Sequence, residues 1–347
     1  MSEAETPSKP RPGAAPPYTP GSRRVLGAVA NIFAPGSGQL LQGRRLRALL
    51  VFAGFGAGMA LLPHWPYAFF FSGAVWVAAI IDSGITRPIR YPTTSRCVGI
   101  IVLTFFGVFM VRSMVMRYYA EAFNVGHNDM APTIRRGDVI VAAKADLGAV
   151  GQPVVYADPC KKGKHRLGRI VARGGDTVEV RCGVLYVNGN QVPHGEASGI
   201  CAFYVSGKTG GWQQQSCQRM SETLAGVDHS IARLPRVPAS AHDFPALAAD
   251  APAPACPPEP KKGEEQSEEQ PPSAEQAAPA PATCKPTKAF DVPKDELFIL
   301  GDNRDDSVDS RTFGPVSADV ILGEVRTIWW STAPERGAQW DRLARIH

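Results

Sequence analysis

Leu300-Gly-Asp-Asn-Arg-Asp-Asp-Ser-Val-Asp-Ser-Arg311 carries more structural information than any other segment of the chain. It begins at the end of the apolar, strand-like run Leu297–Leu300, and Phe313-Gly-Pro follows it closely. A segment so dense in Asp, Asn, Arg and Ser is usually a solvated loop. Its strand-like surroundings instead favour buried ion pairs and loop hydrogen bonds. We therefore expect an ordered polar loop within a β domain.

Short apolar runs fill the chain from about residue 121 onward. Gly-Asp, Gly-Gly-Asp and Asn188-Gly189 separate them, and an Asn-Gly pair between two apolar runs predicts a β-hairpin. The expected strands are Val139–Ala143, Val154–Tyr156, Arg169–Ala172, Thr177–Val180, Val184–Val187 and, last, Val320–Trp330. This pattern predicts an antiparallel β domain over 118–234 and 289–332.

Other segments are too poor in large apolar side chains to build a core. Residues 1–22 are rich in Pro, Ala and Ser and are expected to be a disordered tail, not a secretory signal peptide. Residues 235–288 contain many Pro and Ala and a Lys/Glu/Gln run, which predicts a disordered insertion. A peptide-binding arm is the alternative for this insertion. Residues 333–347 are expected to form a C-terminal tail.

Three charge-poor apolar runs lie within residues 23–117. They predict membrane helices at about 46–62, 67–81 and 97–116, each close to the minimum length for crossing a bilayer. The alternative is buried helices of a soluble domain. Residues 25–43 are expected to form an interfacial or re-entrant helix.

The charge distribution suggests an orientation and argues against one class of partner. The net charge is +5, too mild to indicate nucleic-acid binding. Residues 1–120 contain 12 Lys and Arg against 3 Asp and Glu, and the arginines flank the predicted membrane helices. Basic loops prefer the cytoplasm, so we expect everything after about residue 117 to lie outside it.

Six of the seven cysteines follow residue 117, which fits an oxidising compartment. Six cysteines allow 15 pairings, and free thiols are a further alternative. Pairing of neighbours predicts 160–182, 201–217 and 256–284. No Cys or His spacing typical of zinc sites is present, so no metal is expected.

Two more segments share the character of the polar loop. They are Asn128-Asp-Met-Ala-Pro-Thr-Ile-Arg-Arg-Gly-Asp138 and Gly168-Arg-Ile-Val-Ala-Arg-Gly-Gly-Asp176. In this order, the three segments resemble the signature motifs of bacterial type I signal peptidases, the serine proteases of the S26 family that remove signal peptides. The resemblance implies a mainly-β protein of the bacterial inner membrane, with N-terminal transmembrane helices, an external antiparallel β domain and no cofactor.

The resemblance also assigns positions. The family uses a Ser-Lys dyad, in which a neutral lysine accepts the proton of the attacking serine and a nearby hydroxyl helps to stabilise the oxyanion. The serine position is Asp129, the lysine position Gly168 and the hydroxyl position His127. The supporting residues Ser307, Asp309 and Arg311 match the family.

Losing members of a catalytic unit typically costs about 10³–10⁶ in rate, so these replacements predict an impaired enzyme. Recruitment of Lys161, Lys162 or Lys164 as the base is an alternative. New acid–base chemistry between His127 and Asp129 is another.

The resemblance further implies a groove in which a peptide adds as an extended strand. Met130 and Pro132 are the predicted substrate-binding residues, and they could instead pack the core. Phe123, Val125 and Ile134 are further candidates for which core packing or contact with lipid is favoured.

Three functions remain open from the sequence. The first is an impaired signal-peptidase-like protein that binds the membrane and an extended signal-peptide-like segment or another membrane protein. The second is an active signal peptidase with a non-standard nucleophile or base, such as Ser307 or Ser310. The third is an interaction protein that acts through the insertion and the membrane hairpin. Whether the chain is an enzyme is undecided at this level.

Overall fold

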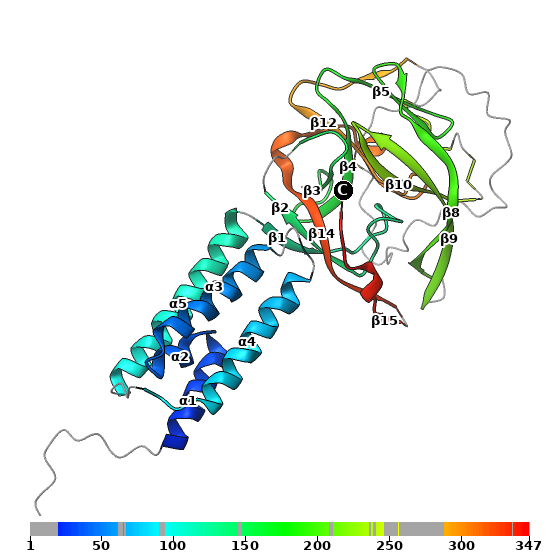
Figure 1. Ribbon diagram of the computed structural model, residues 1–347. Helices are drawn as coiled ribbons and strands as arrows, with labels where there is room; N and C mark the ends of the chain where they lie inside the picture. Colours follow the sequence, from blue (N-terminus) through cyan, green and yellow to red (C-terminus); the bar gives the residue numbers. More distant parts are fainter. Residues whose placement is uncertain are drawn as a thin grey trace, which may run out of the picture. The chain divides into compact units, whose positions relative to one another are not determined.

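The computed structural model describes residues 20–61, 65, 67–89, 94–118, 120–144, 148–207, 211–235, 237–238, 241–245, 256, 288–334 and 336–346. The chain divides into two compact units (Figure 1). One unit comprises Met1–Leu61 and Ala68–Val115, and its described elements are helices. The other comprises Leu62–Tyr67 and Met116–His347 and contains all the strands.

The helical unit contains the three expected apolar helices and two more. Its helices are α1 (Pro20–Phe33), α2 (Ser37–Leu41), α3 (Arg45–Leu61), α4 (Ala68–Ile85) and α5 (Thr94–Tyr118). The segment 25–43 was expected as one helix, but a turn at Gly36, with φ of 88°, divides it into α1 and α2. The predicted tail 1–22 is too long, because α1 starts at Pro20; residues 1–19 lie outside the described residues.

Only α4, among the described helices, is both long and apolar enough to cross a membrane. The helical unit is therefore compatible with a membrane anchor by length and composition alone. A multi-pass arrangement stays a prediction.

A buried amide network joins α1 and α2 to α4. Asn31 Nδ2 donates to Ala79 O at 2.8 Å and to Ser83 Oγ at 2.7 Å. Gln39 Nε2 donates to Ala79 O at 2.9 Å, and Gln42 Nε2 donates to Ser83 O at 2.6 Å. Buried amides require such partners, so the network fixes the three helices relative to one another.

The β unit is built from three antiparallel sheets. Its strands are β1 (Ala120–Asn124), β2 (Asp138–Ala143), β3 (Pro153–Ala157), β4 (His165–Arg173), β5 (Thr177–Arg181), β6 (Val184–Val187), β7 (Asn190–Gln191), β8 (His194–Ser206), β9 (Trp212–Leu224), β10 (Val227–Arg233), β11 (Phe290–Asp291), β12 (Glu296–Leu300), β13 (Val316–Ser317), β14 (Ile321–Ala333), β15 (Gly337–Ala338) and β16 (Ala344–Arg345). The largest sheet has the order β1-β2-β14-β3-β4-β12-β13, and β15 and β16 pair with β14. The second sheet has the order β10-β9-β8 and the third β11-β5-β6-β7. The predicted antiparallel β fold is confirmed.

The core anchors the connection between β1 and β2. Val125, Met130 and Ile134 from this connection are buried in one cluster with residues of β2, β3 and β14. Burial of three apolar side chains anchors the loop to the sheet. The loop therefore holds its polar residues, including Asp129, in a defined place.

The hairpin prediction is confirmed, whereas β8 and β9 have no counterpart among the predicted strands. Asn188 and Gly189 both have positive φ and join β6 to β7, as an Asn-Gly hairpin turn requires. The long strands β8 and β9 consist largely of polar and small residues, so they lack the apolar signal on which the prediction relied.

Two of the three predicted disulfides are wrong. Cys201–Cys217 forms across β8 and β9 as expected. Cys160 pairs with Cys256, 96 residues away, and this excludes both 160–182 and 256–284. Cys182 is also disulfide-bonded. Pairing follows which cysteines the fold brings within about 5–6 Å between Cα atoms, which sequence proximity does not determine.

The start of the predicted insertion and the predicted C-terminal tail differ from expectation. Residues 246–255 and 257–287 lie outside the described residues. Phe244, expected inside the disordered insertion, is buried, forms a bridge with Val180 and packs against Phe298 with ring centroids 5.1 Å apart. Residues 337–338 and 344–345 pair with β14, and Ile346 is buried in the core, so the predicted tail is largely part of the sheet.

Candidate functional site

A buried ion pair anchors the polar loop that follows β12. Arg169 on β4 donates through Nε to Asp302 Oδ1 at 2.9 Å and through Nη2 to Asp302 Oδ2 at 2.8 Å. Both side chains are fully buried, and Arg169 Nη1 also donates to Gly151 O at 2.7 Å. Such a bidentate pair holds two segments in one geometry, so the loop is fixed to β4.

A second pair connects the same loop to β9. Arg304 donates to both carboxylate oxygens of Glu222, and His229 Nε2 lies 3.1 Å from Glu222 Oε1. Burial alone would raise the pKa of Glu222, but Arg304 and His229 more than offset this and hold it at about 2. Glu222 therefore stays ionised and serves as a structural anchor.

The three supporting residues lie together as the resemblance implies. Ser307 Oγ donates to Asp309 Oδ2 at 2.6 Å, and Arg311 donates to Asp309 Oδ1 at 2.9 Å and to Ser307 Oγ at 3.0 Å. Burial opposes ionisation of Asp309, yet Arg311, Ser307 and the Gly301 N–H lower the pKa of Asp309 below its usual value. Gly301 N donates to Asp309 Oδ2 at 3.0 Å, which ties this cluster to the start of the loop.

The same loop positions Asp129. Asn303 N donates to Asp129 O at 2.9 Å, and Asn303 Nδ2 donates to Asn128 O at 3.2 Å. Asp302 N donates to Met130 Sδ at 3.4 Å. The turn that carries Asp129 therefore rests against the polar loop.

An arginine that the sequence analysis missed forms an ion pair with the Asp129 side chain. Arg166 Nη1 lies 3.7 Å from Asp129 Oδ2, and Arg166 Nε lies 2.9 Å from Asp158 Oδ2. Arg166 Nη1 also donates to Val308 O at 3.2 Å. The guanidinium therefore binds two carboxylates and a carbonyl at the predicted catalytic position.

The signal that could have found Arg166 is strand alternation. Arg166 precedes Gly168 by two residues on β4, so the two positions share one face of the strand. Phe123 and His165, at the end of β1 and the start of β4, have ring centroids 5.4 Å apart. The sheet thus brings β1 close to β4 although three strands separate them in its order.

Gly168, the predicted lysine position, has no room for a side chain. A Cβ at Gly168 would approach Ile299 Cγ2 to under 3.0 Å and would lie 3.5 Å from Tyr156 Cε1. Tyr156 is fully buried, and its hydroxyl makes no hydrogen bond within the described part of the chain. Burial raises the pKa of Tyr156 well above its usual value, so the hydroxyl stays protonated.

The other predicted site residues differ in their burial. His127 is exposed on the loop. Met130 and Pro132 are buried, and Met130 belongs to the core cluster beneath the sheet. Lys162 and Lys164 are exposed and Lys161 is half-buried. Ser310 is fully buried, and its Oγ accepts a hydrogen bond from Ile299 N.

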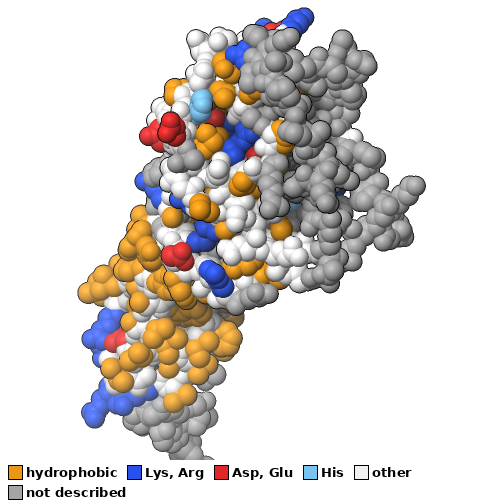
Figure 2. Space-filling view, turned by 90° about the vertical axis from the view of Figure 1, so that its right-hand side faces the viewer, with side chains coloured by type: hydrophobic (Ala, Val, Ile, Leu, Met, Phe, Trp, Pro, Cys, Tyr) orange, Lys and Arg blue, Asp and Glu red, His pale blue; other side chains and the backbone are white. Residues whose placement is uncertain are grey.

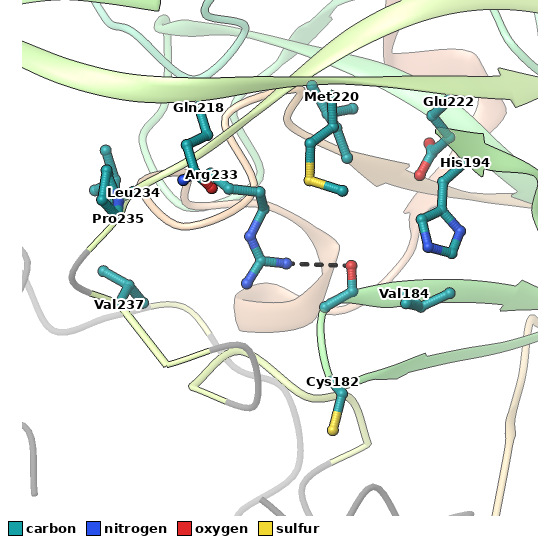
Figure 3. Close-up of a pocket in the computed structure, with 12 residues that line it drawn as sticks. Cys182, Val184, His194, Gln218, Met220, Glu222, Arg233, Leu234, Pro235 and Val237 are labelled. Atoms are coloured by element: carbon teal, nitrogen blue, oxygen red, sulfur yellow. Dashed lines mark hydrogen bonds between the residues drawn. The ribbon is translucent and has the colours of Figure 1, made fainter. Parts of the chain in front are cut away.

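A pocket of about 320 Å³ lies between the β5–β6 hairpin and strands β9 and β10 (Figure 3). Arg233 donates to Gly183 O across it at 3.2 Å. Its lining residues are Cys182, Gly183, Val184, His194, Gln218, Met220, Glu222, Ile231, Arg233, Leu234, Pro235 and Val237. None of the predicted dyad and oxyanion positions, His127, Asp129 and Gly168, lines this pocket. Among the described residues, no three His, Cys, Asp or Glu side chains are grouped to hold a metal ion.

Comparison with known proteins identifies the family. The sequence profile described as "Signal peptidase, peptidase S26" matches residues 97–330. Signal peptidase I of Buchnera aphidicola subsp. Baizongia pistaciae is 41% identical over 61 residues, which are 16% of this chain and 20% of that protein. Mitochondrial inner membrane protease subunit 2 of Saccharomyces cerevisiae is 38% identical over 45 residues, 13% of this chain and 25% of that protein. The chain thus matches only a fifth to a quarter of the length of these relatives.

A crystal structure of a signal peptidase I from Enterococcus faecalis also matches, with a TM-score of 0.23 and 16% identity, over 51% of this chain and 95% of that chain. The profile match covers well over half of the chain and spans all three polar motifs. The chain therefore belongs to the signal peptidase family, peptidase S26.

Proposed function

We propose that this chain is a signal-peptidase-like membrane protein that does not hydrolyse signal peptides but binds an extended peptide at the outer face of the bacterial inner membrane. The helical unit would anchor it by several passes, and the β unit would lie outside the cytoplasm. A second membrane protein that offers an extended segment is an equivalent partner in this proposal.

One observation carries the proposal: the nucleophile position holds a carboxylate that is ion-paired with Arg166, 3.7 Å away. An ionised carboxylate bound to a guanidinium is a weak nucleophile toward an amide. The lysine position is a glycine against which Ile299 and Tyr156 are packed. No general base can therefore act from position 168.

The binding part of the proposal rests on the backbone. β1 is at one edge of its sheet, and β12 pairs with β4 only from Arg169 onward. Residues 165–168 of β4 therefore pair with β3 on one side, and the pairing with β12 on the other side does not extend to them. They lie close to the end of β1. A peptide strand added here would gain main-chain hydrogen bonds, and the buried Met130 and Pro132 would support the floor rather than contact side chains directly.

The test has two arms and uses the full chain in detergent micelles. In the cleavage arm, we expect no processing of a preprotein that an active signal peptidase I cleaves under the same conditions. In the binding arm, we expect a fluorescent signal-sequence peptide to bind. N-methylation of alternate peptide bonds in one register should abolish binding, and N-methylation in the other register is the matched control.

An active enzyme is the competing function, because Ser307, Asp309 and Arg311 form a complete hydrogen-bonded cluster. Cleavage by the parent that Ser307→Ala abolishes, or labelling of Ser307 or Ser310 by a serine-reactive acyl probe, would refute the impaired-enzyme proposal. An interaction protein acting through the insertion would instead keep its partners when the peptide site is blocked and lose them when residues 246–287 are deleted.

A further inference from the structure

Arginines gather at one end of the helical unit. The described side chains of this unit include Arg24, Arg44, Arg45, Arg47 and Arg87, and the one acidic side chain among them is Asp82. Figure 2 shows blue Lys and Arg side chains together within the otherwise hydrophobic surface of the helices. Five positive charges against one negative charge make this a strongly basic patch.

Helix packing, not sequence proximity, brings the arginines together. Ile89 N donates to Gln42 O at 3.0 Å, and Arg44 Nη2 donates to Arg87 O at 3.1 Å, so the start of α3 meets the end of α4. A Cβ at Gly27 would lie 2.8 Å from Gln42 Nε2, which places the first turns of α1 at the same end. Arg24 precedes Gly27 by about one helical turn.

The patch contains more hydrogen-bond donors than the described residues satisfy. Arg47 pairs with Asp82, which also accepts a hydrogen bond from Gln39. The Nε atoms of Arg24 and Arg44 are buried and have no hydrogen-bond partner within the residues that the structure describes. Both side chains are half-buried, so their guanidinium groups are open to an anionic acceptor from outside the chain.

Apolar side chains border the arginines on the outside of the helices. Leu46, Leu49, Ile85 and Ile89 are 63–70% exposed. Exposed apolar surface next to several cations is suited to a ligand that has an anionic head and hydrocarbon chains.

We propose that this end of the helical unit binds the phosphodiester headgroup of an anionic phospholipid such as phosphatidylglycerol. Arg24, Arg44 and Arg87 would contact the phosphate, and Leu46 and Ile85 would contact the acyl chains. The inference rests on the membrane association stated under the proposed function. The buried amide network of Asn31, Gln39 and Gln42 holds the helices in place, so the arginines are preorganised.

The experiment uses the full chain in a neutral detergent, with phosphatidylglycerol and phosphatidylcholine of identical acyl chains added in equal amounts. Native mass spectrometry counts the lipids retained by each protein molecule. We expect retention of phosphatidylglycerol over phosphatidylcholine, and a loss of about fivefold in its affinity for each arginine replaced. The test variant is Arg24→Gln/Arg44→Gln/Arg87→Gln.

The matched control is Arg173→Gln/Arg336→Gln/Arg345→Gln, which removes three exposed arginines of the β unit. Equal retention of the two lipids by the parent, a measurement that needs no variant, would overturn the inference. The inference also fails if the test variant retains phosphatidylglycerol as well as the control does. Retention that inorganic phosphate at the same concentration displaces would identify a site for free phosphate and refute the lipid. No peptide is present, so this result is independent of the two arms that test the proposed function.

Discussion

Replacing Gly168 by alanine should destabilise the β unit, because the site has no space for one methyl group. The added Cβ would approach Ile299 Cγ2 to under 3.0 Å and would lie 3.3 Å from Leu300 O. Ile299, Leu300 and Tyr156 are all fully buried, and Ile299 N donates to Ser310 Oγ at 3.0 Å, so the neighbours cannot easily move away. Overpacking of this kind costs about 1–3 kcal/mol of unfolding free energy.

Truncating Ile299, which faces Gly168, can make room for the added methyl group. Ile299→Ala removes Cγ2 and alone should cost about 2–5 kcal/mol, because it leaves a cavity. In that background the alanine methyl at position 168 fills part of the cavity, so Gly168→Ala should cost less than about 1 kcal/mol. The difference between the two backgrounds isolates the contact between residues 168 and 299.

The measurement is urea unfolding of the full chain in detergent, followed by near-UV circular dichroism. Gly126→Ala is the control, because a Cβ at Gly126 meets nothing within 4 Å and should change the unfolding free energy little. An equal cost of Gly168→Ala in both backgrounds, or no cost in the parent, would show that the site does have room. In that case a variant with Asp129→Ser and Gly168→Lys would need no further change to hold the lysine. If the site is closed, as the structure indicates, the same variant also needs Ile299→Ala.

Three further perturbations follow from the buried charges and the tight loop. The pKa of Glu222 is lowered from 4.5 to about 2 in the folded protein, so its stabilising effect is complete above pH about 4.5 and is lost as the pH falls through about 2. On acid titration, the unfolding free energy of the parent should fall by about 3 kcal/mol more than that of Glu222→Gln. Equal falls in the two proteins would contradict the lowered pKa of Glu222. Asp302→Ala leaves Arg169 buried without its carboxylate and should cost about 3–5 kcal/mol in urea unfolding, while a cost below about 1 kcal/mol would argue against a buried pair. Gly301→Ala places a Cβ 2.5 Å from Asp129 O and should lower the thermal midpoint by several degrees in calorimetry. An unchanged midpoint would mean that the loop moves enough to accommodate the added methyl group.

The three polar motifs predicted the family, and the strand-like runs with their turn residues predicted the antiparallel β class. The family motifs and the β class can be predicted from local patterns, because strand alternation and turn residues involve residues that are close together in the sequence. The residues at 127, 129 and 168 predicted which groups of the dyad and its oxyanion site are replaced, and this assignment stays a prediction. Those conclusions needed no tertiary contact.

The sequence left the surroundings of these positions undetermined. Curling of the sheet brings β4 against β1, and this makes Arg166 the partner of Asp129. Packing of β12 onto β4 closes the space at Gly168, and folding of distant segments pairs Cys160 with Cys256. Each is a contact between residues far apart in the chain, and such contacts depend on the relative position of whole strands, which short-range periodicity does not encode.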